Sequence, residues 1–267
     1  MGFFKRTSPL EKEYLSLMKD ERKFMLKRQE EKVGFLNKTL EGKVPEKLRS
    51  TLDAAFCKAF ELIFKKGVGA IELTYKKENL QKEFKLRQAV MDIKGTRRSV
   101  KAFNKTAKAE DNFHLLLSGV SGVSMGILGI GIPDIPVFTA MMLRDIYKTA
   151  VSFGFKYDSW EERFFILKCI EASVSKGSSL SSIDTELNSF IERGFIPDTY
   201  TEEKQIERTS KALSSALLYM KFLQGIPIAG AVGGIYDAVY MKEIASYSTL
   251  KYRKRFLTCK FKEEKRS

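Results

Sequence analysis

An uncharged stretch from Asn112 to Pro133 constrains the fold of this chain more than any other feature. Its only ionisable side chain is His114, taken as neutral, and it is long enough to cross a bilayer by length alone. Glycines recur along it at intervals of three, four and three residues, at Gly119, Gly122, Gly126 and Gly129. This spacing puts them on one face of a helix, where a second backbone can approach closely. The stretch therefore predicts a tightly packed helical hairpin, either inserted in a membrane or at the centre of a soluble bundle.

The last third of the chain repeats this pattern. Residues 222–236 are uncharged, and Gly230, Gly234 and Ala238 recur every four residues. Strand-like alternation and hairpin-turn dipeptides between apolar runs are missing from the sequence. We therefore predict an all-α fold, a single helical bundle with two glycine-rich apolar hairpins at its centre, near residues 112–154 and 212–250.

Apolar residues recur at helical spacing along most of the remaining chain. The expected helices cover residues 9–41, residues from Ser50 to a break at Gly67 and Gly69, residues 70–110 with breaks near 77–79 and at Gly95, residues 134–154 and residues 159–174. Ser159 and Glu162 form a capping box that opens the last of these. A serine-rich loop is expected at residues 178–182. We divide the chain into a charged helical segment at 1–43 and one helical domain at 44–260.

The net charge of +14 is concentrated at the two ends of the chain. Residues 1–111 hold 27 Lys and Arg against 16 Asp and Glu, and residues 212–267 hold ten against four. Such a surplus favours an anionic membrane surface, an acidic partner or nucleic acid, although solvated faces of lysine-rich helices give the same count. The segment Lys251, Arg253, Lys254 and Arg255 is the candidate contact with an anionic surface.

Charged residues also occur within or beside apolar helices, at Asp134, Arg144, Asp145 and Asp237. An unpaired charge there would be costly, so pairing is expected. One interpretation is a polar site for an anionic head group or a partner. The other is a structural ion pair between Arg144 and an aspartate, with Asp134 as a helix N-cap.

Motifs of common enzyme classes are missing from the sequence, including the phosphate-binding loop, the dinucleotide fingerprint, the zinc-protease helix and the nucleophile elbow. One histidine cannot supply a histidine-rich metal site. Three widely separated cysteines, Cys57, Cys169 and Cys259, fit reduced thiols in a cytoplasm rather than disulfides. We expect no catalytic residue, no metal and no cofactor.

Three blocks of sequence resemble the EcsC family. They are Ala55–Tyr75, the glycine-rich run with Pro-Asp-Ile-Pro and Arg144-Asp145-Ile146 at residues 119–154, and Ile226–Leu257. The resemblance implies a context beside an ABC transporter, because the family takes its name from a gene next to those of such a transporter. It implies no catalytic residue, since the family's activity is not established. Relatives often carry Asn at the position of Asp237, so a role that needs an amide there is in doubt.

These observations give a functional hypothesis and an alternative. We expect a non-catalytic protein, cytoplasmic and peripheral at the inner face of the cell membrane, that binds anionic lipid or a membrane protein such as an ABC transporter. The alternative is an enzyme, hydrolytic for example, with an unrecognised site around Asp134, Arg144 and Asp237. Nucleic acid ranks third, because the basic residues alternate with acids and no nucleic-acid motif is recognisable.

Arg144 gives a first test of the buried-charge interpretation. If Arg144 is neutralised in the interior by Asp134, Asp145 or Asp237, Arg144→Ala should cost about 3–5 kcal/mol, because it leaves the partner charge unpaired. Urea unfolding measures the loss, and an unchanged midpoint would argue against burial.

Overall fold

The structure is a computed structural model that describes residues 7–29, 44–103, 134–224 and 230–265. Every regular element in these ranges is a helix, which confirms the all-α prediction. In chain order the elements are α1 (Pro9–Lys27), α3 (Glu46–Leu62), the π-helical turn η1 (Ile63–Gly67), α4 (Val68–Glu72), α5 (Lys77–Lys94), α6 (Arg97–Phe103), α8 (Asp134–Ser152), α9 (Trp160–Val174), α10 (Gly177–Arg193), α11 (Glu202–Gln224) and α12 (Gly230–Glu264).

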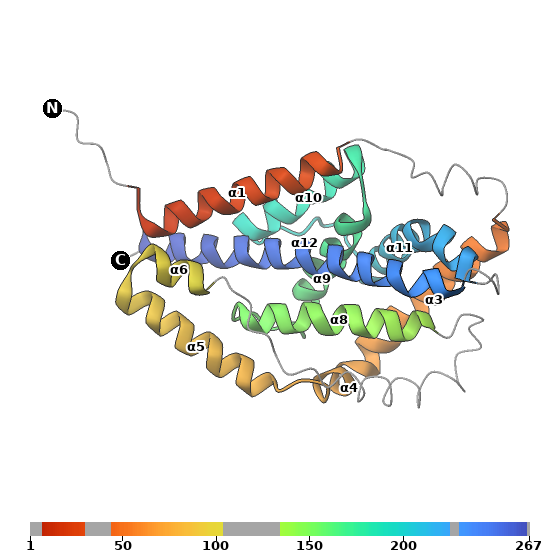
Figure 1. Ribbon diagram of the computed structural model, residues 1–267, viewed down its shortest axis with the longest axis horizontal. Helices are drawn as coiled ribbons and strands as arrows, with labels where there is room; N and C mark the ends of the chain where they lie inside the picture. The colour runs from red at the N-terminus through yellow and green to blue at the C-terminus, as the bar shows by residue number, and fades with distance from the viewer. Residues whose placement is uncertain (1–6, 30–43, 104–133, 225–229, 266–267) are drawn as a thin grey trace.

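Helix α12 runs along the length of the bundle and packs against α1, α8, α9, α10 and α11 (Figure 1). In this view α1 and α10 lie on one side of α12, and α8 and α5 lie on the other. The short helix α6 contacts both α1 and α5, so it closes the end of the bundle where the C-terminus lies. A long central helix thus organises the described residues.

Helix α9 is the most completely buried element. Eleven of its fifteen residues are buried, and the apolar ones occur on all sides of the helix. A helix that is apolar all round needs neighbours all round, and α10, α11 and α12 surround it. Its N-cap is Ser159, whose hydroxyl accepts the Glu162 amide as predicted. The Glu162 carboxylate turns inward, however, where it accepts hydrogen bonds from Tyr252 and Arg255 on α12.

The predicted helix breaks are confirmed in part. Residues 46–72 are helical throughout, with the π-helical turn η1 ending at Gly67 and Gly69 inside α4. The break predicted near residues 77–79 lies at 73–76, before α5 starts at Lys77. Gly95 ends α5 with a φ of 53°, a left-handed conformation that glycine adopts without strain.

Other boundaries also differ from the sequence-based expectations. Helix α1 ends at Lys27 rather than at residue 41. Helix α3 begins at Glu46, directly after Pro45, rather than at Ser50. The serine-rich segment 178–182 is not a loop but the start of α10. Leu180, Ile183 and Leu187 recur at helical spacing and are buried, so tertiary packing overrides the weak helix propensity of the serines.

The predicted glycine-rich hairpins fall only partly within the described residues. Residues 112–133 lie outside them, whereas Gly230, Gly233 and Gly234 lie at the start of α12. Helix α11 packs against α12, as the two arms of the second hairpin would. Among the described residues, no helix combines the length and apolar character needed to cross a membrane.

Helix α1 belongs to the same core as the rest of the described chain. Its residues Leu10 and Leu17 join one apolar cluster with residues of α3, α9 and α12, and Ser8 and Glu11 cap its start reciprocally. The part of segment 1–43 that the structure describes therefore packs onto the main helical domain.

Among the described glycines, Gly154, just after α8, is one at which a side chain would meet both backbone strain and a steric clash. Its φ is 82°, and a β-carbon there would lie 2.3 Å from the ring of Phe84. We expect Gly154→Ala to destabilise the protein by about 2–4 kcal/mol, because backbone strain and overpacking add. Gly69→Ala is the control, since nothing lies within 4 Å of its added β-carbon, and it should be neutral or stabilising by up to about 1 kcal/mol. Urea unfolding of both variants tests this, and equal effects would contradict it.

Candidate functional site

Two lysines of α12, Lys251 and Lys254, lie in the interior with their ammonium groups among carboxylates. Lys251 Nζ lies 2.6 Å from an oxygen of Asp184 on α10 and donates a hydrogen bond to Glu21 on α1. Lys254 Nζ lies 2.8 Å from the other oxygen of Glu21. The amide oxygen of Asn188 accepts from both ammonium groups, at 3.0 and 2.9 Å. Two cations and two carboxylates thus form a charge-balanced cluster that ties α1 and α10 to α12.

Asp184 is the most heavily hydrogen-bonded carboxylate of this cluster. It accepts from the Tyr247 hydroxyl at 2.6 Å and from the Asn188 amide at 2.8 Å. Burial raises the pKa of the Asp184 carboxyl, but the charge and hydrogen bond of Lys251 and the Tyr247 hydroxyl together hold it below its ordinary value. Asp184 is therefore ionised at neutral pH.

The other two cations of this segment are also paired. Arg253 lies 2.9 Å from Glu13 and 3.1 Å from Asp20, both on α1. Arg255 donates to Glu162 at 2.6 Å. Its guanidinium carbon lies 4.2–5.1 Å from the centres of three rings, those of Phe155, Phe165 and Phe190.

The expected contact of Lys251, Arg253, Lys254 and Arg255 with an anionic surface does not agree with these positions. Lys251 and Lys254 are buried, and Arg253 and Arg255 are partly buried. The segment looked exposed because the carboxylates that neutralise it come from α1, α9 and α10, far away in sequence.

A signal for this arrangement exists in the sequence. Ile244, Tyr247, Lys251 and Lys254 recur at helical spacing, so the lysines continue an apolar face. On α1, Glu13 and Glu21 lie on the same face as buried Leu17. Lysines within one apolar stripe and carboxylates within another predict pairing between the two helices.

Helix α1 has a cationic outer face as a result. It holds five Lys and Arg against four Asp and Glu, but Glu13 and Glu21 point inward, which leaves five exposed cations against two exposed carboxylates. Five residues follow one another along its outer face at intervals of three or four: Lys12, Leu15, Lys19, Arg22 and Leu26. We call these five residues the α1 stripe.

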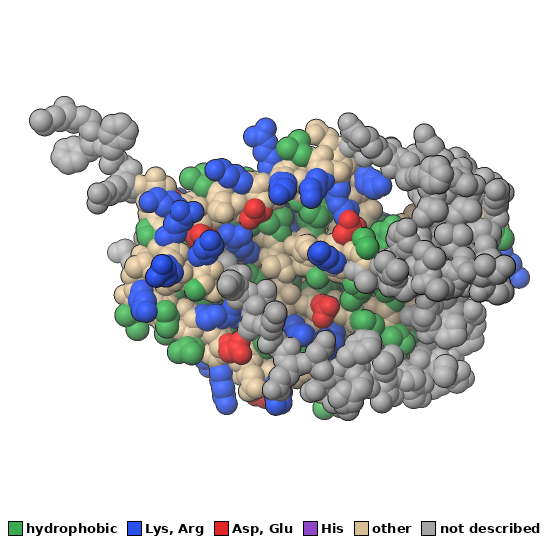
Figure 2. Space-filling model, in the orientation of Figure 1, with side chains coloured by type: hydrophobic (Ala, Val, Ile, Leu, Met, Phe, Trp, Pro, Cys, Tyr) green, Lys and Arg blue, Asp and Glu red, His purple; other side chains and the backbone are tan. Residues whose placement is uncertain are grey.

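A second group of exposed cations lies where α1, α5, α6 and α12 meet, and we call it the basic end. Its members are Lys12, Lys94, Arg97, Arg98, Lys101, Lys262 and Lys265. Contacts across this end include the rings of Tyr14 and Phe261, 5.4 Å apart, and Lys260 with Asp92 at 3.4 Å. Figure 2 shows Lys and Arg gathered over this end and along α1, with few Asp and Glu among them.

The exposed carboxylates of the basic end are mostly engaged locally. Glu11 accepts the backbone N–H of Ser8, and both Asp92 and Glu263 pair with Lys260. Among the seven cations, Arg97 also lies 3.8 Å from Glu13. The cations are therefore partly offset, and the end keeps a positive potential.

Arg144 is buried, as expected, but its described partners include the backbone as well as an aspartate. Its Nε donates to the Thr74 hydroxyl at 3.0 Å and its Nη2 to the Thr74 carbonyl at 3.3 Å. Asp145 lies 3.5 Å from its Nη1, so the expected ion pair with an aspartate is present at a longer distance. The side chains of Asp134 and Asp237 lie outside the described residues, although their backbones fall in α8 and α12.

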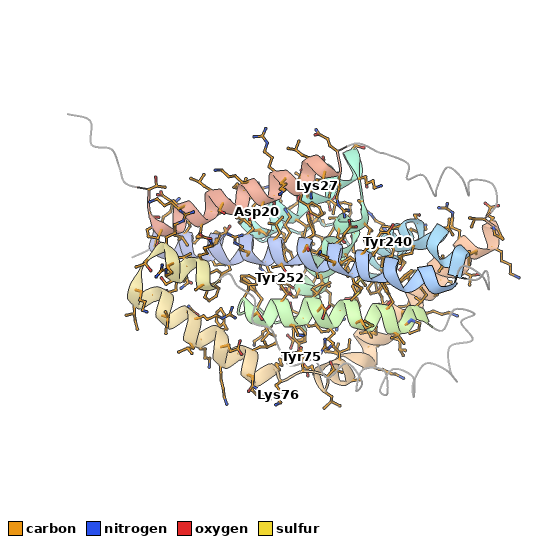
Figure 3. The ribbon with its side chains drawn as sticks, viewed as in Figure 1. Asp20, Lys27, Tyr75, Lys76, Tyr240 and Tyr252 are labelled. Carbon is orange, nitrogen blue, oxygen red and sulfur yellow. The ribbon has the colours of Figure 1, made fainter. Side chains whose placement is uncertain are left out.

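Beside Arg144, a chain of hydrogen bonds joins the α4–α5 turn to Tyr157 (Figure 3, near Tyr75). Tyr75 donates to the Tyr157 hydroxyl at 2.7 Å, and Tyr157 donates to Glu72, which Lys77 also approaches at 2.6 Å. Burial and the neighbouring Glu72 raise the pKa of Tyr157 well above its ordinary value. These groups satisfy one another, which is what a structural network requires.

Metal binding finds no support among the described residues, which contain no group of three or more His, Cys, Asp or Glu placed to hold an ion. Burial also raises the pKa of the Cys169 thiol, so this cysteine stays protonated.

Comparison with known proteins gives a family and one distant relative. A sequence model described as "EcsC protein family" matches residues 11–257. A Bacillus subtilis (strain 168) protein described as "Uncharacterized protein YdbA" is 23% identical over 150 residues, which is 55% of this chain and 55% of that protein. The chain thus covers about half the length of this relative. No solved structure matches.

The buried cluster predicts a pH-dependent effect of Asp184→Asn. The folded pKa of Asp184 lies below its unfolded value of about 3.8. Its ionised form therefore stabilises the fold fully above that value, and this contribution is lost as pH falls through the lowered pKa. We expect Asp184→Asn to cost about 3–5 kcal/mol at pH 7, because Lys251 loses its partner. The cost should shrink at a pH below the lowered pKa.

Urea unfolding of the wild type and the variant at both pH values measures this. Glu207→Gln is a matched control, because Glu207 and its partner Lys211 are both exposed on α11, and solvent screening leaves such a pair little effect on stability. A pH-independent cost for Asp184→Asn would contradict the assignment.

Proposed function

We propose that this protein, which belongs to the EcsC protein family, is a non-catalytic peripheral protein whose basic end docks on an anionic membrane surface. The observation that carries the proposal is the group of exposed, locally unbalanced cations at that end. The relative from Bacillus subtilis is described only as uncharacterised, so it supplies no activity.

The charge of the basic end is sufficient for such docking. Each Lys or Arg close to an anionic leaflet contributes about 1 kcal/mol, and this attraction falls off within about 10 Å at 0.1 M salt. Seven cations within one end of the bundle would therefore hold the protein reversibly, with strong sensitivity to salt. The cytoplasmic leaflet is the anionic face of a cell membrane, which supports a location at its inner surface.

The α1 stripe extends from Lys12 of the basic end along the side of the bundle opposite α5. Its two leucines are more than half exposed and lie among three cations. This face suits a partner protein with acidic and apolar side chains rather than the bilayer itself. A membrane-protein partner such as an ABC transporter, which the family resemblance implies, would meet the protein beside this surface.

The test compares two triple variants in a vesicle co-sedimentation assay. Arg97→Gln, Arg98→Gln and Lys101→Gln remove three charges from the basic end, whereas Lys58→Gln, Lys65→Gln and Lys66→Gln remove three exposed charges from α3 and η1. Both variants have the same net charge, so only the position of the charges differs. With vesicles rich in phosphatidylglycerol, we expect the first variant to bind roughly 10- to 100-fold more weakly and the second nearly as well as wild type.

Binding of the wild type should rise with the anionic fraction and fall with salt. Equal losses of vesicle binding in the two variants would mean that the basic end is not the membrane-binding surface. Equal binding to neutral vesicles would remove the electrostatic basis of the proposal. Failure to bind any vesicle would leave a protein partner as the reason for the basic end.

A further inference from the structure

The outer face of α5 carries an exposed apolar stripe next to the basic end. Leu86, Val90 and Ile93 are 67%, 37% and 84% exposed, and their spacing of four and three residues aligns them along the helix. Leu73, in the turn before α5, is 79% exposed. A single exposed leucine is ordinary, but an aligned series on one helix marks an interaction surface.

The opposite face of α5 holds the helix in the bundle. Leu80 and Met91 are buried, and the ring of Phe84 packs edge-on against Phe103 of α6, with centres 5.7 Å apart. Arg87 donates to the carbonyl of Phe103 and to that of Ser152, both at 3.0 Å. The helix is therefore fixed without help from its outer stripe, which is free to serve another purpose.

The charges near the stripe favour an anionic occupant. At steps of three and four residues from Asn79, one line along the helix carries Lys82, Leu86, Val90 and Ile93. The exposed carboxylates beside the apolar part of this line are Glu83, three residues before Leu86, and Asp92, which pairs with Lys260, so cations predominate. Lys94 follows Ile93 directly, and Arg97 and Arg98 begin α6. In Figure 1, α5 lies on the outside of the bundle and leads into α6 at this end.

We infer that this stripe inserts into the boundary between head groups and acyl chains of an anionic bilayer, with α5 lying at the membrane surface. The inference rests on the proposed function. The basic end provides the electrostatic attraction, and the apolar residues provide a second, salt-resistant contribution by burial in lipid. Lys82 and Lys94 flank the stripe at its two ends, where their long side chains can reach the head groups.

A tryptophan placed at the exposed end of the stripe tests insertion. The chain has one tryptophan, Trp160, which is 54% exposed at the start of α9. The variant Ile93→Trp with Trp160→Phe therefore reports on the stripe alone, and the wild-type protein is the matched control. The probe is vesicles of phosphatidylglycerol and phosphatidylcholine whose acyl chains carry bromine.

On binding, the emission of the α5 tryptophan should shift to the blue, and bromine should quench it at least about twofold more than Trp160. A variant that sediments with the vesicles but shows neither change would overturn insertion and leave the proposed function intact. If neither protein sediments with any vesicle, the proposed function fails and the inference fails with it.

A second variant tests the same inference without an introduced tryptophan. Leu86→Ser with Ile93→Ser should leave the unfolding midpoint unchanged, since both residues are exposed, and should retain binding at low salt. Its binding at high salt should fall roughly tenfold, because the apolar contribution is lost. Unchanged binding at high salt would contradict insertion. So would a wild-type homodimer that this variant abolishes, because the stripe would then belong to an interface between two copies.

Discussion

The arrangement of the bundle depends on the ion pairs between α12 and its neighbours. Taking the ammonium groups of Lys251 and Lys254 out of water costs several kcal/mol each, and only well-placed carboxylates offset that cost. Glu21 contacts both lysines, and Asp184 contacts Lys251. A shift of α1 or α10 by one helical turn would separate these groups and leave charges unpaired in the core. The pairs therefore help to fix the position of α1 and α10 along α12, because any other register would leave a buried charge without its partner.

The position of α1 in turn creates the charge pattern of the surface. In sequence this helix is nearly balanced, with five cations against four carboxylates. Once Glu13 and Glu21 are buried against α12, its outer face has five cations against two carboxylates. The same pairs withdraw the basic segment of α12 from the surface. Carboxylates of α1 are thus buried against cations of α12, and the exposed cations come from α1, α5, α6 and the C-terminal end of α12 rather than from residues 251–255.

The pairing between α1 and α12 shows which features of the structure could be predicted from the sequence and which could not. Helical periodicity was sufficient for the all-α class and Gly95 for the end of α5, because these depend on local spacing and backbone conformation. The α10 start at Gly177 was missed, since buried Leu180 and Ile183 outweigh the local preference of the serines. The burial of Lys251 and Lys254 was not predicted, because the partners of Lys251 come from residues up to 230 positions away. Local charge counts contain no information about such pairs, whereas complementary charged positions within apolar stripes do.

The buried lysines of α12 and the exposed cations of the basic end also differ in the free energy needed to bring them to a membrane surface. Releasing Lys251 from Glu21 and Asp184 would cost about 3–5 kcal/mol, whereas one lysine at an anionic surface regains about 1 kcal/mol. An anionic bilayer would therefore be too weak to open the buried cluster, and the pairs would stay closed in the proposed docking. The cations of the basic end need no such release, because they are already exposed. In the proposed docking the described helices would consequently keep their arrangement, with the buried lysines holding them in place and the exposed ones making the contact.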